Sequence, residues 1–197
     1  MVTLAVETRL PTDFGEFALR AYADGSPQPH LALIQGKIDG PDAPIVRIHS
    51  ECMTGDVFGS QRCDCGIQLE VALEMIAREG SGLLIYLRQE GRGIGLLSKL
   101  HAYNLQDAGL DTVDANLHLG FGADEREYGA ALEILQDLGV SSVRLLTNNP
   151  AKLAALEHSP IAVVERIPLL APVTDHNRGY LIAKRQRMGH LTENLPR

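Results

Sequence analysis

Three cysteines in one short stretch constrain this chain more than any other feature. They are Cys52, Cys63 and Cys65, the whole cysteine content of 197 residues, and they fall within residues 49–66, HSECMTGDVFGSQRCDCG. Thiolates at this spacing can converge on one soft cation, and three protein ligands on Zn²⁺ leave its fourth tetrahedral position open to water or substrate. The pattern therefore predicts a metal centre of the catalytic kind.

Other interpretations of these cysteines have to be weighed. A disulfide between Cys63 and Cys65 would close a very short, strained loop, and an odd number of cysteines argues against a disulfide framework. Unrelated buried thiols would be scattered along the chain rather than clustered among polar residues and glycines. His49 lies three residues before Cys52, so a structural zinc site closed by this histidine stays an open alternative.

The amino-acid composition limits the classes of protein to which this chain can belong. The chain is 45% hydrophobic and 22% charged, as in an ordinary globular protein, and it contains no run of eighteen apolar residues. The N-terminal residues do not resemble a secretory signal, so unpaired cysteines point to a reducing cytoplasm. The formal charge of −7 speaks against a general nucleic-acid binder. We expect a soluble cytoplasmic protein with no membrane span and no nucleic-acid partner.

Hydrophobic periodicity predicts strands first and alternating helices and strands later. A turn-forming cluster at 11–15 predicts a β-hairpin over residues 3–22. Further strands are expected at His30–Ile38, Pro44–His49, Leu83–Leu87, Val143–Leu146 and Ile161–Arg166. Helices are expected from Gln68 to Gly80, from about Leu96 to Asp107, near Tyr128–Leu138, over Pro150–His158 and over Arg178–His190.

This order of elements predicts an α+β fold, with a mixed β-sheet and flanking helices in a single domain over residues 1–197. Within it we expect a β-rich front (about 1–66), an α/β back (about 67–170) and a C-terminal helical tail (about 175–197). The tail is rich in lysine and arginine. Whether it packs on the body of the protein or reaches a neighbouring subunit stays open.

Three further polar segments follow strands or precede helices. Residues 88–95, RQEGRGIG, offer free backbone N–H groups and two arginines to an anion, although a solvated turn is an equally good interpretation. Residues 122–127, GADERE, place carboxylates beside an arginine, as an ordinary helix start also does. Residues 146–152, LTNNPAK, carry a lysine into a helix. Neither a dinucleotide fingerprint nor a P-loop is present, so a nucleotide would be held in another way.

Taken together, these motifs closely resemble the GTP cyclohydrolase II family. The resemblance is carried by RIHSECMTGDVFGSQRCDCG at 47–66, RQEGRGIGL at 88–96, Asp124–Arg126 and RLLTNNPAK at 144–152, and it extends over nearly the whole chain. It implies a zinc-dependent hydrolase that opens the guanine ring of GTP in the first step of riboflavin biosynthesis. The implied products are 2,5-diamino-6-(5-phosphoribosylamino)pyrimidin-4(3H)-one, formate and pyrophosphate.

The resemblance also assigns roles to residues. One Zn²⁺ per subunit is expected on Cys52, Cys63 and Cys65, Mg²⁺ is expected with the triphosphate, Asp124 is the implied proton acceptor, and Arg126 is the implied nucleophile toward the α-phosphate. The residues expected to bind GTP are Arg47, Ile48, His49, Ser50, Glu51, Gln68, Glu90, Gly91, Arg92, Tyr103, Thr112, Thr147 and Lys152, with Tyr103 stacking on guanine. A homodimer is also implied. Because the motifs begin by residue 47, we expect the free-standing form without a fused dihydroxybutanone phosphate synthase domain.

Elementary chemistry refines two of these roles. Water activated by zinc suits both ring opening and deformylation, but three thiolates give the site a formal charge of −1 and weaken the metal as a Lewis acid. Neighbouring donors such as Arg62 or His49 could offset that charge. A guanidinium has no free lone pair at neutral pH, so an electrostatic role for Arg126 competes with the nucleophilic one.

Two other functions compete with this hydrolase. The first is a regulatory module that binds GTP around a structural zinc site and turns nothing over. The second is a specialised paralogue that stops before deformylation.

Overall fold

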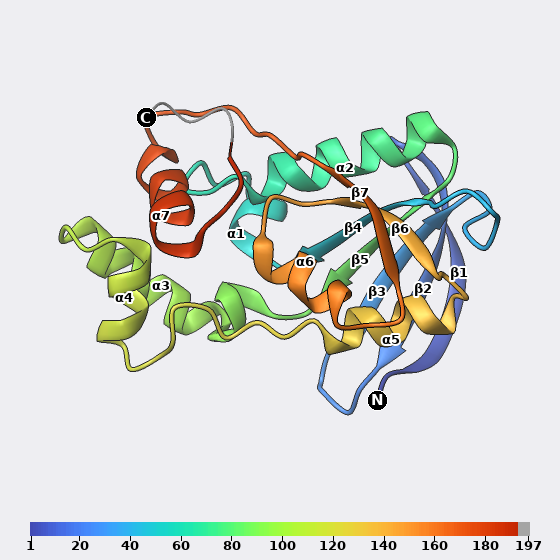
Figure 1. Ribbon diagram of the computed structural model, residues 1–197. Helices are drawn as coiled ribbons and strands as arrows, with labels where there is room; N and C mark the ends of the chain where they lie inside the picture. Colours follow the sequence, from blue (N-terminus) through green and yellow to red (C-terminus); the bar gives the residue numbers. More distant parts are fainter. Residues whose placement is uncertain (193–197) are drawn as a thin grey trace. The chain divides into compact units, whose positions relative to one another are not determined.

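The computed structural model describes residues 1–192, and in this part of the chain a seven-stranded mixed sheet carries the fold (Figure 1). The strand order is β1-β2-β3-β5-β4-β6-β7. The strands are β1 (Thr3–Thr12), β2 (Gly15–Ala23), β3 (His30–Gln35), β4 (Ile45–Ser50), β5 (Gly82–Leu87), β6 (Ser142–Leu146) and β7 (Ala162–Ile167). The predicted α+β class with a mixed sheet is confirmed.

The helices lie where the 3.6-residue periodicity predicts them, with three additions. The predicted ones are α2 (Cys65–Glu79), α3 (Gly95–Asp107), α5 (Gly129–Asp137), α6 (Pro150–Glu157) and α7 (Arg178–Met188). The additions are α1 (Met53–Asp56), the short 3₁₀ helix η1 (Glu90–Gly93) and α4 (Thr112–His118). None of the described helices has the length and apolar character needed to cross a membrane.

The described chain divides into two compact units. We call the first the sheet unit, formed by Met1–His49, Glu70–Arg88 and Tyr128–Leu169. The second, the helical unit, is formed by Ser50–Leu69, Gln89–Glu127 and the described residues from Leu170 onward. The sequence-based division into a front, a back and a tail stays a prediction.

The sheet unit begins with the predicted hairpin. Strands β1 and β2 pair antiparallel with Thr12 opposite Gly15. The Thr12 hydroxyl donates to the Gly15 carbonyl at 2.8 Å and accepts from the Phe14 N–H at 3.1 Å. Gly15 has a φ of +120°, which a residue with a side chain rarely adopts. The turn therefore needs glycine at this position.

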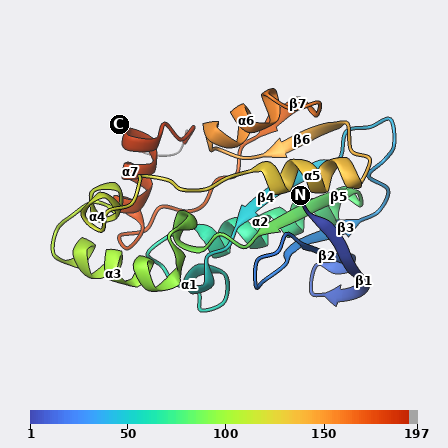
Figure 2. The same ribbon diagram turned by 90° about the horizontal axis from the view of Figure 1, so that it is seen from below.

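Both faces of the central strands are covered by helices. Alternate residues of β5, including Leu83 and Ile85, belong to the same buried cluster as Ile134 of α5. On the other face, a Cβ at Gly82 would lie 3.0 Å from Ile76 of α2, so α2 packs closely there. Figures 1 and 2 show α5 and α2 on opposite sides of the strands. Such double coverage explains the continuous apolar run of β5.

Strands β4, β6 and β7 are parallel, which gathers their polar carboxyl ends at one edge. The predicted segments 47–49 and 147–152 follow or end these strands. Asn149 caps α6 by accepting from the N–H of Ala151 at 2.9 Å, and Pro150 opens the helix. The sheet thus presents two of the predicted polar segments side by side.

The helical unit is held together by side-chain contacts over long sequence distances. Asp111 caps α4 by accepting from two backbone N–H groups at 2.8 Å. The same carboxylate accepts from Arg187 of α7 at 2.5 Å, and Asp114 accepts from Arg187 at 2.9 Å. Lys184 of α7 donates to Asp64 at 3.0 Å. The C-terminal helix therefore packs within the helical unit.

Candidate metal centre and active-site pocket

The sulfur atoms of Cys52, Cys63 and Cys65 lie within 4.8 Å of one another and form a group that could hold a metal ion. The Cys52 and Cys63 sulfurs are 3.7 Å apart, and both residues are buried. Local structure explains how cysteines from a fourteen-residue stretch meet, because Cys52 directly precedes α1 and Cys65 begins α2. His49, the alternative fourth ligand, belongs to the sheet unit, where its ring stacks on Tyr86 with centroids 5.4 Å apart.

Two glycines leave room for this sulfur cluster. A Cβ placed on Gly55 would lie 3.0 Å from the Cys63 sulfur and 3.2 Å from the Cys52 sulfur. A Cβ on Gly66 would lie 2.4 Å from the carbonyl oxygen of Gly55, which is an impossible contact. The space between the sulfurs thus depends on both glycines. Three convergent thiols in such a space suit a thiophilic cation such as Zn²⁺.

A lysine lies against the sulfur cluster. The Nζ atom of Lys99, on α3, donates to the Cys52 sulfur at 3.0 Å and to Glu90 Oε1 at 2.8 Å. The other Glu90 oxygen accepts from the Met53 N–H at 2.6 Å, and Oε1 also accepts from the N–H of Gly91 at 2.7 Å. Lys99 and Glu90 are only 11% and 10% exposed. The metal group and the RQEGRGIG loop are therefore joined by one buried ion pair.

Electrostatics favour a thiolate at Cys52. Hydrogen bonds from the Cys63 and Cys65 thiols lower the pKa of Cys52 well below its usual value, and Lys99 lowers it further. Conversely, the hydrogen bond to Cys52 raises the pKa of Cys63 to about 11. Burial alone would lower the pKa of Lys99, but the charge of Cys52 and the hydrogen bond with Glu90 raise it above the usual value. Lys99 is therefore a permanent cation.

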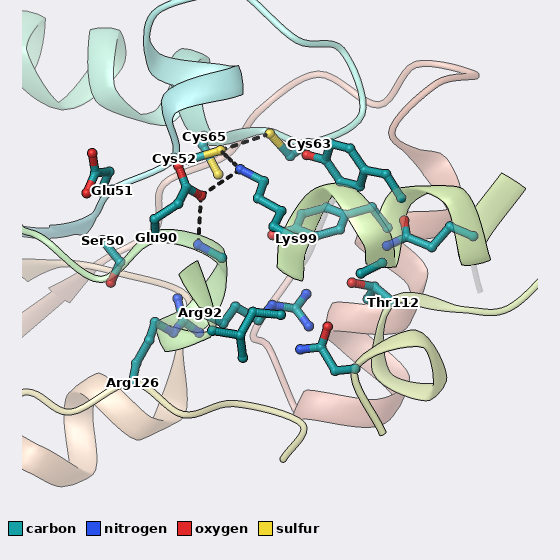
Figure 3. Close-up of a pocket in the computed structure, with 17 residues that line it drawn as sticks. Ser50, Glu51, Cys52, Cys63, Cys65, Glu90, Arg92, Lys99, Thr112 and Arg126 are labelled. Carbon is teal, nitrogen blue, oxygen red and sulfur yellow. Dashed lines mark hydrogen bonds and ion pairs between the residues drawn. The ribbon is translucent and has the colours of Figure 1, made fainter. Parts of the chain in front are cut away.

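The sulfur cluster opens into a pocket that lies wholly within the helical unit. Figure 3 shows the three sulfurs and the Lys99 amino group gathered at one end, with Arg92 and Arg126 toward the other. The residues that line the pocket are Ser50, Glu51, Cys52, Cys63, Cys65, Glu90, Gly91, Arg92, Ile94, Lys99, Ala102, Tyr103, Gln106, Thr112, Asn116, Arg126 and Tyr180. One pocket thus combines a soft-metal group with two guanidinium groups.

The arginine end is shaped by a strained loop. Arg92 has a φ of +64°, in the left-handed region, and its two terminal nitrogens are buried without a hydrogen-bond partner among the described residues. Its guanidinium carbon lies 5.4 Å from the ring centroid of Tyr180, on α7. A Cβ at Gly93 would lie 2.8 Å from the Glu125 carbonyl oxygen, so this loop and the 122–127 segment pack backbone to backbone. A buried cation without an acceptor is suited to an anionic ligand.

Arg126 and Asp124 form a two-point ion pair beside this loop. The Nε atom of Arg126 donates to Asp124 Oδ1 at 2.7 Å, and Nη2 donates to Oδ2 at 2.5 Å. Burial raises the pKa of Asp124, but the hydrogen bonds and charge of Arg126 outweigh it and hold that pKa below the usual value. Arg126 lines the pocket, and its two-point pair with Asp124 fixes the direction of its guanidinium group.

Tyr103 supplies a ring to the pocket wall. Its hydroxyl lies 3.3 Å from the Thr54 hydroxyl, and the Arg62 guanidinium carbon lies 4.9 Å from its ring centroid. Arg62 also forms an ion pair with Asp107 at 2.8 Å. Burial raises the pKa of Tyr103, while Thr54 opposes that shift. The phenol therefore stays neutral and offers an apolar face between two cations.

A second group of predicted residues lies in the sheet unit. Lys152 donates to the Ile48 carbonyl at 2.7 Å, and Arg47 donates to the Leu146 carbonyl at 3.0 Å. Thr147 accepts from the Asn149 N–H at 3.1 Å, and His49 is 1% exposed. The parallel edge of β4 and β6 thus gathers Arg47, Ile48, His49, Thr147 and Lys152.

Eleven of the predicted site residues line the pocket of the helical unit, whereas two others lie just outside it. These two are Asp124, described above, and Gln68, which donates to Asp64 at 2.5 Å. Sequence reasoning missed Lys99 and Tyr180. Lys99 lies one helical turn before Tyr103, so the shared helix face was a usable signal for it. Tyr180 had no comparable signal because the pairing of α7 with distant segments is not written in local periodicity.

Comparison with known proteins agrees with this site. The family model described as GTP cyclohydrolase II matches residues 3–168, which include the three cysteines and both arginine segments of the pocket. The chain belongs to the GTP cyclohydrolase II family. The match ends before α7, although Tyr180 of that helix lines the pocket.

Curated relatives of the chain are about twice as long. It is 55% identical over 192 residues to the riboflavin biosynthesis protein RibBA of Bacillus cereus (strain B4264), covering 97% of this chain and 48% of the relative. The same values hold for RibBA of Bacillus mycoides (strain KBAB4). The chain thus spans about half the length of these relatives. A solved structure of RibBX, a two-domain 3,4-dihydroxy-2-butanone 4-phosphate synthase from A. baumannii, is 21% identical with a TM-score of 0.49, covering 87% of this chain and 40% of that chain.

Proposed function

We propose that this chain is a zinc-dependent GTP cyclohydrolase II, which opens the imidazole ring of guanine in the first step of riboflavin biosynthesis. The observation that carries the proposal is the pocket of the helical unit, with three convergent cysteine sulfurs at one end and the guanidinium groups of Arg92 and Arg126 toward the other. A nucleoside triphosphate has matching ends, namely a base to be hydrolysed and an anionic chain to be held. Membership of the family supports this substrate.

The residues at the sulfur end and at the arginine end of the pocket would have different roles. Cys52, Cys63 and Cys65 would hold a zinc ion, which when bound supplies Lewis acidity for attack of water on the base and on the resulting formamide. The face of Tyr103 that lines the pocket would stack on guanine, and its closeness to the sulfurs would bring the imidazole ring of the base toward them. Glu90, fixed by three hydrogen bonds, offers a rigid acceptor edge.

The phosphate end needs positive charge that is not already neutralised. The buried, unpartnered nitrogens of Arg92 would suit a phosphate oxygen as hydrogen-bond acceptor. The positive φ of Arg92 shows that the loop holding this side chain is strained. Release of pyrophosphate would be assisted by Arg126 and by Mg²⁺ on the triphosphate. The role in GTP binding expected of Arg47, Ile48, His49, Thr147 and Lys152 stays a prediction of the family resemblance.

Two roles for Arg126 can be separated by trapping. The two-point pair with Asp124 would let the carboxylate take the proton if the guanidinium attacked the α-phosphate. The same pair also fixes Arg126 as an electrostatic clamp, which needs no deprotonation. Rapid quenching with GTP labelled at the α-phosphate should leave label on the protein in the first case. Its absence from the protein at all times would rule out the nucleophilic role.

Product analysis tests the function itself. Purified protein with zinc, Mg²⁺ and GTP should release formate and pyrophosphate and form the diaminopyrimidinone ribosyl phosphate, identified by its mass. A product that retains the formyl group would identify the specialised paralogue, and GTP binding without any product would identify the regulatory module. ATP is the control substrate, because its amino group presents a different hydrogen-bonding edge and should not be turned over.

Three further features remain predictions that follow from the family. They are the homodimer, the cytoplasmic location and the requirement for Mg²⁺. Sedimentation of the purified chain checks the first, and turnover with and without Mg²⁺ checks the third.

A further inference from the structure

Lys99 contacts the sulfur cluster and lies outside the set of residues to which the family motifs assign a role. Its ammonium group bridges the Cys52 sulfur at 3.0 Å and Glu90 Oε1 at 2.8 Å. The side chain is 11% exposed, so water screens these contacts poorly. Its Nζ atom also lies 5.7 Å from the ring centroid of Tyr103. A long, flexible side chain is thus fixed by three neighbours at the edge of the proposed metal centre.

The charge of the cluster explains why a cation belongs there. Three thiolates and one Zn²⁺ carry a net charge of −1, and strong donation from three sulfurs weakens the metal as an electrophile. The ammonium group of Lys99, which is shared between the Cys52 sulfur and Glu90, offsets part of this negative charge. A charge-assisted hydrogen bond to a sulfur also withdraws electron density from it, which restores part of the electrophilicity of the metal.

The geometry distinguishes Lys99 from the other nearby cations. Arg62 is bound to Asp107 at 2.8 Å and is 41% exposed, so its charge is already compensated and partly screened. Arg126 is paired with Asp124. Lys99 shares its charge between Glu90 and a cysteine sulfur, and this direct contact is the way in which an outer cation can act on a metal.

We propose that Lys99 is a positioning residue that tunes the metal centre by donating to the Cys52 thiolate, and that it thereby keeps a three-sulfur zinc site electrophilic enough for hydrolysis. The inference rests on the proposed function, because it assumes a metal ion on the three cysteines. The proposed role predicts a change in the electronic absorption of the bound metal that can be measured without turnover. A lysine that only supports the loop around Glu90 would not produce this effect.

The test replaces zinc with Co²⁺ and records the sulfur-to-cobalt charge-transfer absorption of the wild type and Lys99→Met proteins. Loss of the ammonium group makes the Cys52 sulfur a stronger donor, so the band should shift to longer wavelength. The zinc enzyme should lose roughly 10- to 100-fold in kcat while KM for GTP changes much less. Lys99→Arg, which keeps a charged donor, should restore part of both properties.

Glu90→Gln is the matched control. It removes the charge at the other end of the same bridge and keeps the Lys99–Cys52 contact, so the cobalt band should stay at the wild-type position whatever happens to GTP binding. Circular dichroism of each variant establishes that it is folded. Lys99→Gln, similar in length to Met but polar, serves as the second charge-removing variant if Lys99→Met does not fold.

The outcomes separate the inference from the proposed function. A wild type protein that binds Co²⁺ without a sulfur charge-transfer band would refute the three-cysteine site, and with it the proposed function. A wild type band that is unmoved in both folded charge-removing variants would overturn the role of Lys99 and leave the proposed function standing. A shift of equal size in Glu90→Gln would also overturn it, because the effect would then arise from the loop.

Discussion

Gly55 is one of the two glycines that leave space for the cysteine sulfurs to meet. Gly55 is buried in α1, and the sulfur atoms of Cys52 and Cys63 both lie within 3.2 Å of the position that its Cβ would take. A methyl group there would occupy the volume into which the sulfurs converge. At the residue scale, the metal centre therefore depends on a glycine that offers no ligand.

Gly55→Ala should abolish stoichiometric zinc binding without unfolding the protein. The added methyl group would lie within 3.2 Å of the Cys52 and Cys63 sulfurs and of the Cys65 Cβ atom, so the three cysteine side chains must separate. Zinc content after dialysis should fall from one per chain by tenfold or more, as measured by atomic absorption, with an unchanged far-ultraviolet dichroism spectrum. Gly179→Ala on α7 is the control, because nothing lies within 4 Å of its Cβ position. Full zinc occupancy in Gly55→Ala would show that the sulfurs do not need the space beside Gly55.

Sequence was most informative for residues whose chemistry is rare. Three cysteines within fourteen residues predicted a metal group, and the structure brings their sulfurs together. Lys99 was missed because lysines on helix surfaces are common, and only the three-dimensional contact singles one out. Arg62 was suggested as a cation that offsets the charge of the metal site. Its guanidinium group is instead bound to Asp107.

At the scale of elements, α7 completes the pocket from outside the region that the family model matches. Tyr180 lines the pocket beside Arg92, and Lys184 is bound to Asp64, which stands between two of the three cysteines. Lys184 and Asp64 are 11% and 4% exposed. The ion pair thus ties the C-terminal helix directly to the cysteine stretch.

Lys184→Met should destabilise the protein by about 3 kcal/mol, because it leaves the Asp64 carboxylate buried without its cation. Equilibrium unfolding in urea measures this change, and hydrogen exchange should show faster exchange in α7. Gln186→Met is the control, since it introduces the same side chain at an exposed position of the same helix. Adding Asp64→Asn to Lys184→Met should recover part of the loss. An effect no larger than that of the control would show that the pair contributes little.

Elements with strong periodicity were predicted within a few residues, whereas α1, η1 and α4 were not predicted. The hairpin, α3, α5 and β6 follow clear patterns of two or 3.6 residues. By contrast, α4 is seven residues long and has a polar sequence, and its main signal is the capping carboxylate of Asp111. Long-range ion pairs fix the position of α7, and no local pattern encodes them.

A buried tyrosine in the sheet unit should make the stability of the whole molecule decrease at alkaline pH. Tyr22 is fully buried and donates to Asp137 at 2.7 Å, which links β2 to the end of α5. Burial and the bond to Asp137 raise the pKa of Tyr22 from 10.0 to about 12. Because the folded state holds this proton more tightly, the resulting stabilisation is complete below pH 10 and is lost as the pH rises toward 12.

Tyr22→Phe should remove this alkaline loss. Between pH 8 and 11.5 the unfolding free energy of the wild type should fall more steeply than that of the variant, with the difference between them shrinking by an amount on the order of 2 kcal/mol. Urea unfolding at several pH values measures both curves. Parallel curves would show that Tyr22 ionises equally easily in both states.

The proposed function of the whole chain depends on a metal ion that Cys52, Cys63 and Cys65 hold for the hydrolysis of GTP. The most direct test titrates zinc into metal-free protein and measures formate released from GTP in the presence of Mg²⁺. The rate should rise in proportion to zinc up to one equivalent per chain, and Cys63→Ser should release no formate. Zinc-replete, folded protein that binds GTP and releases no formate would contradict the proposed function.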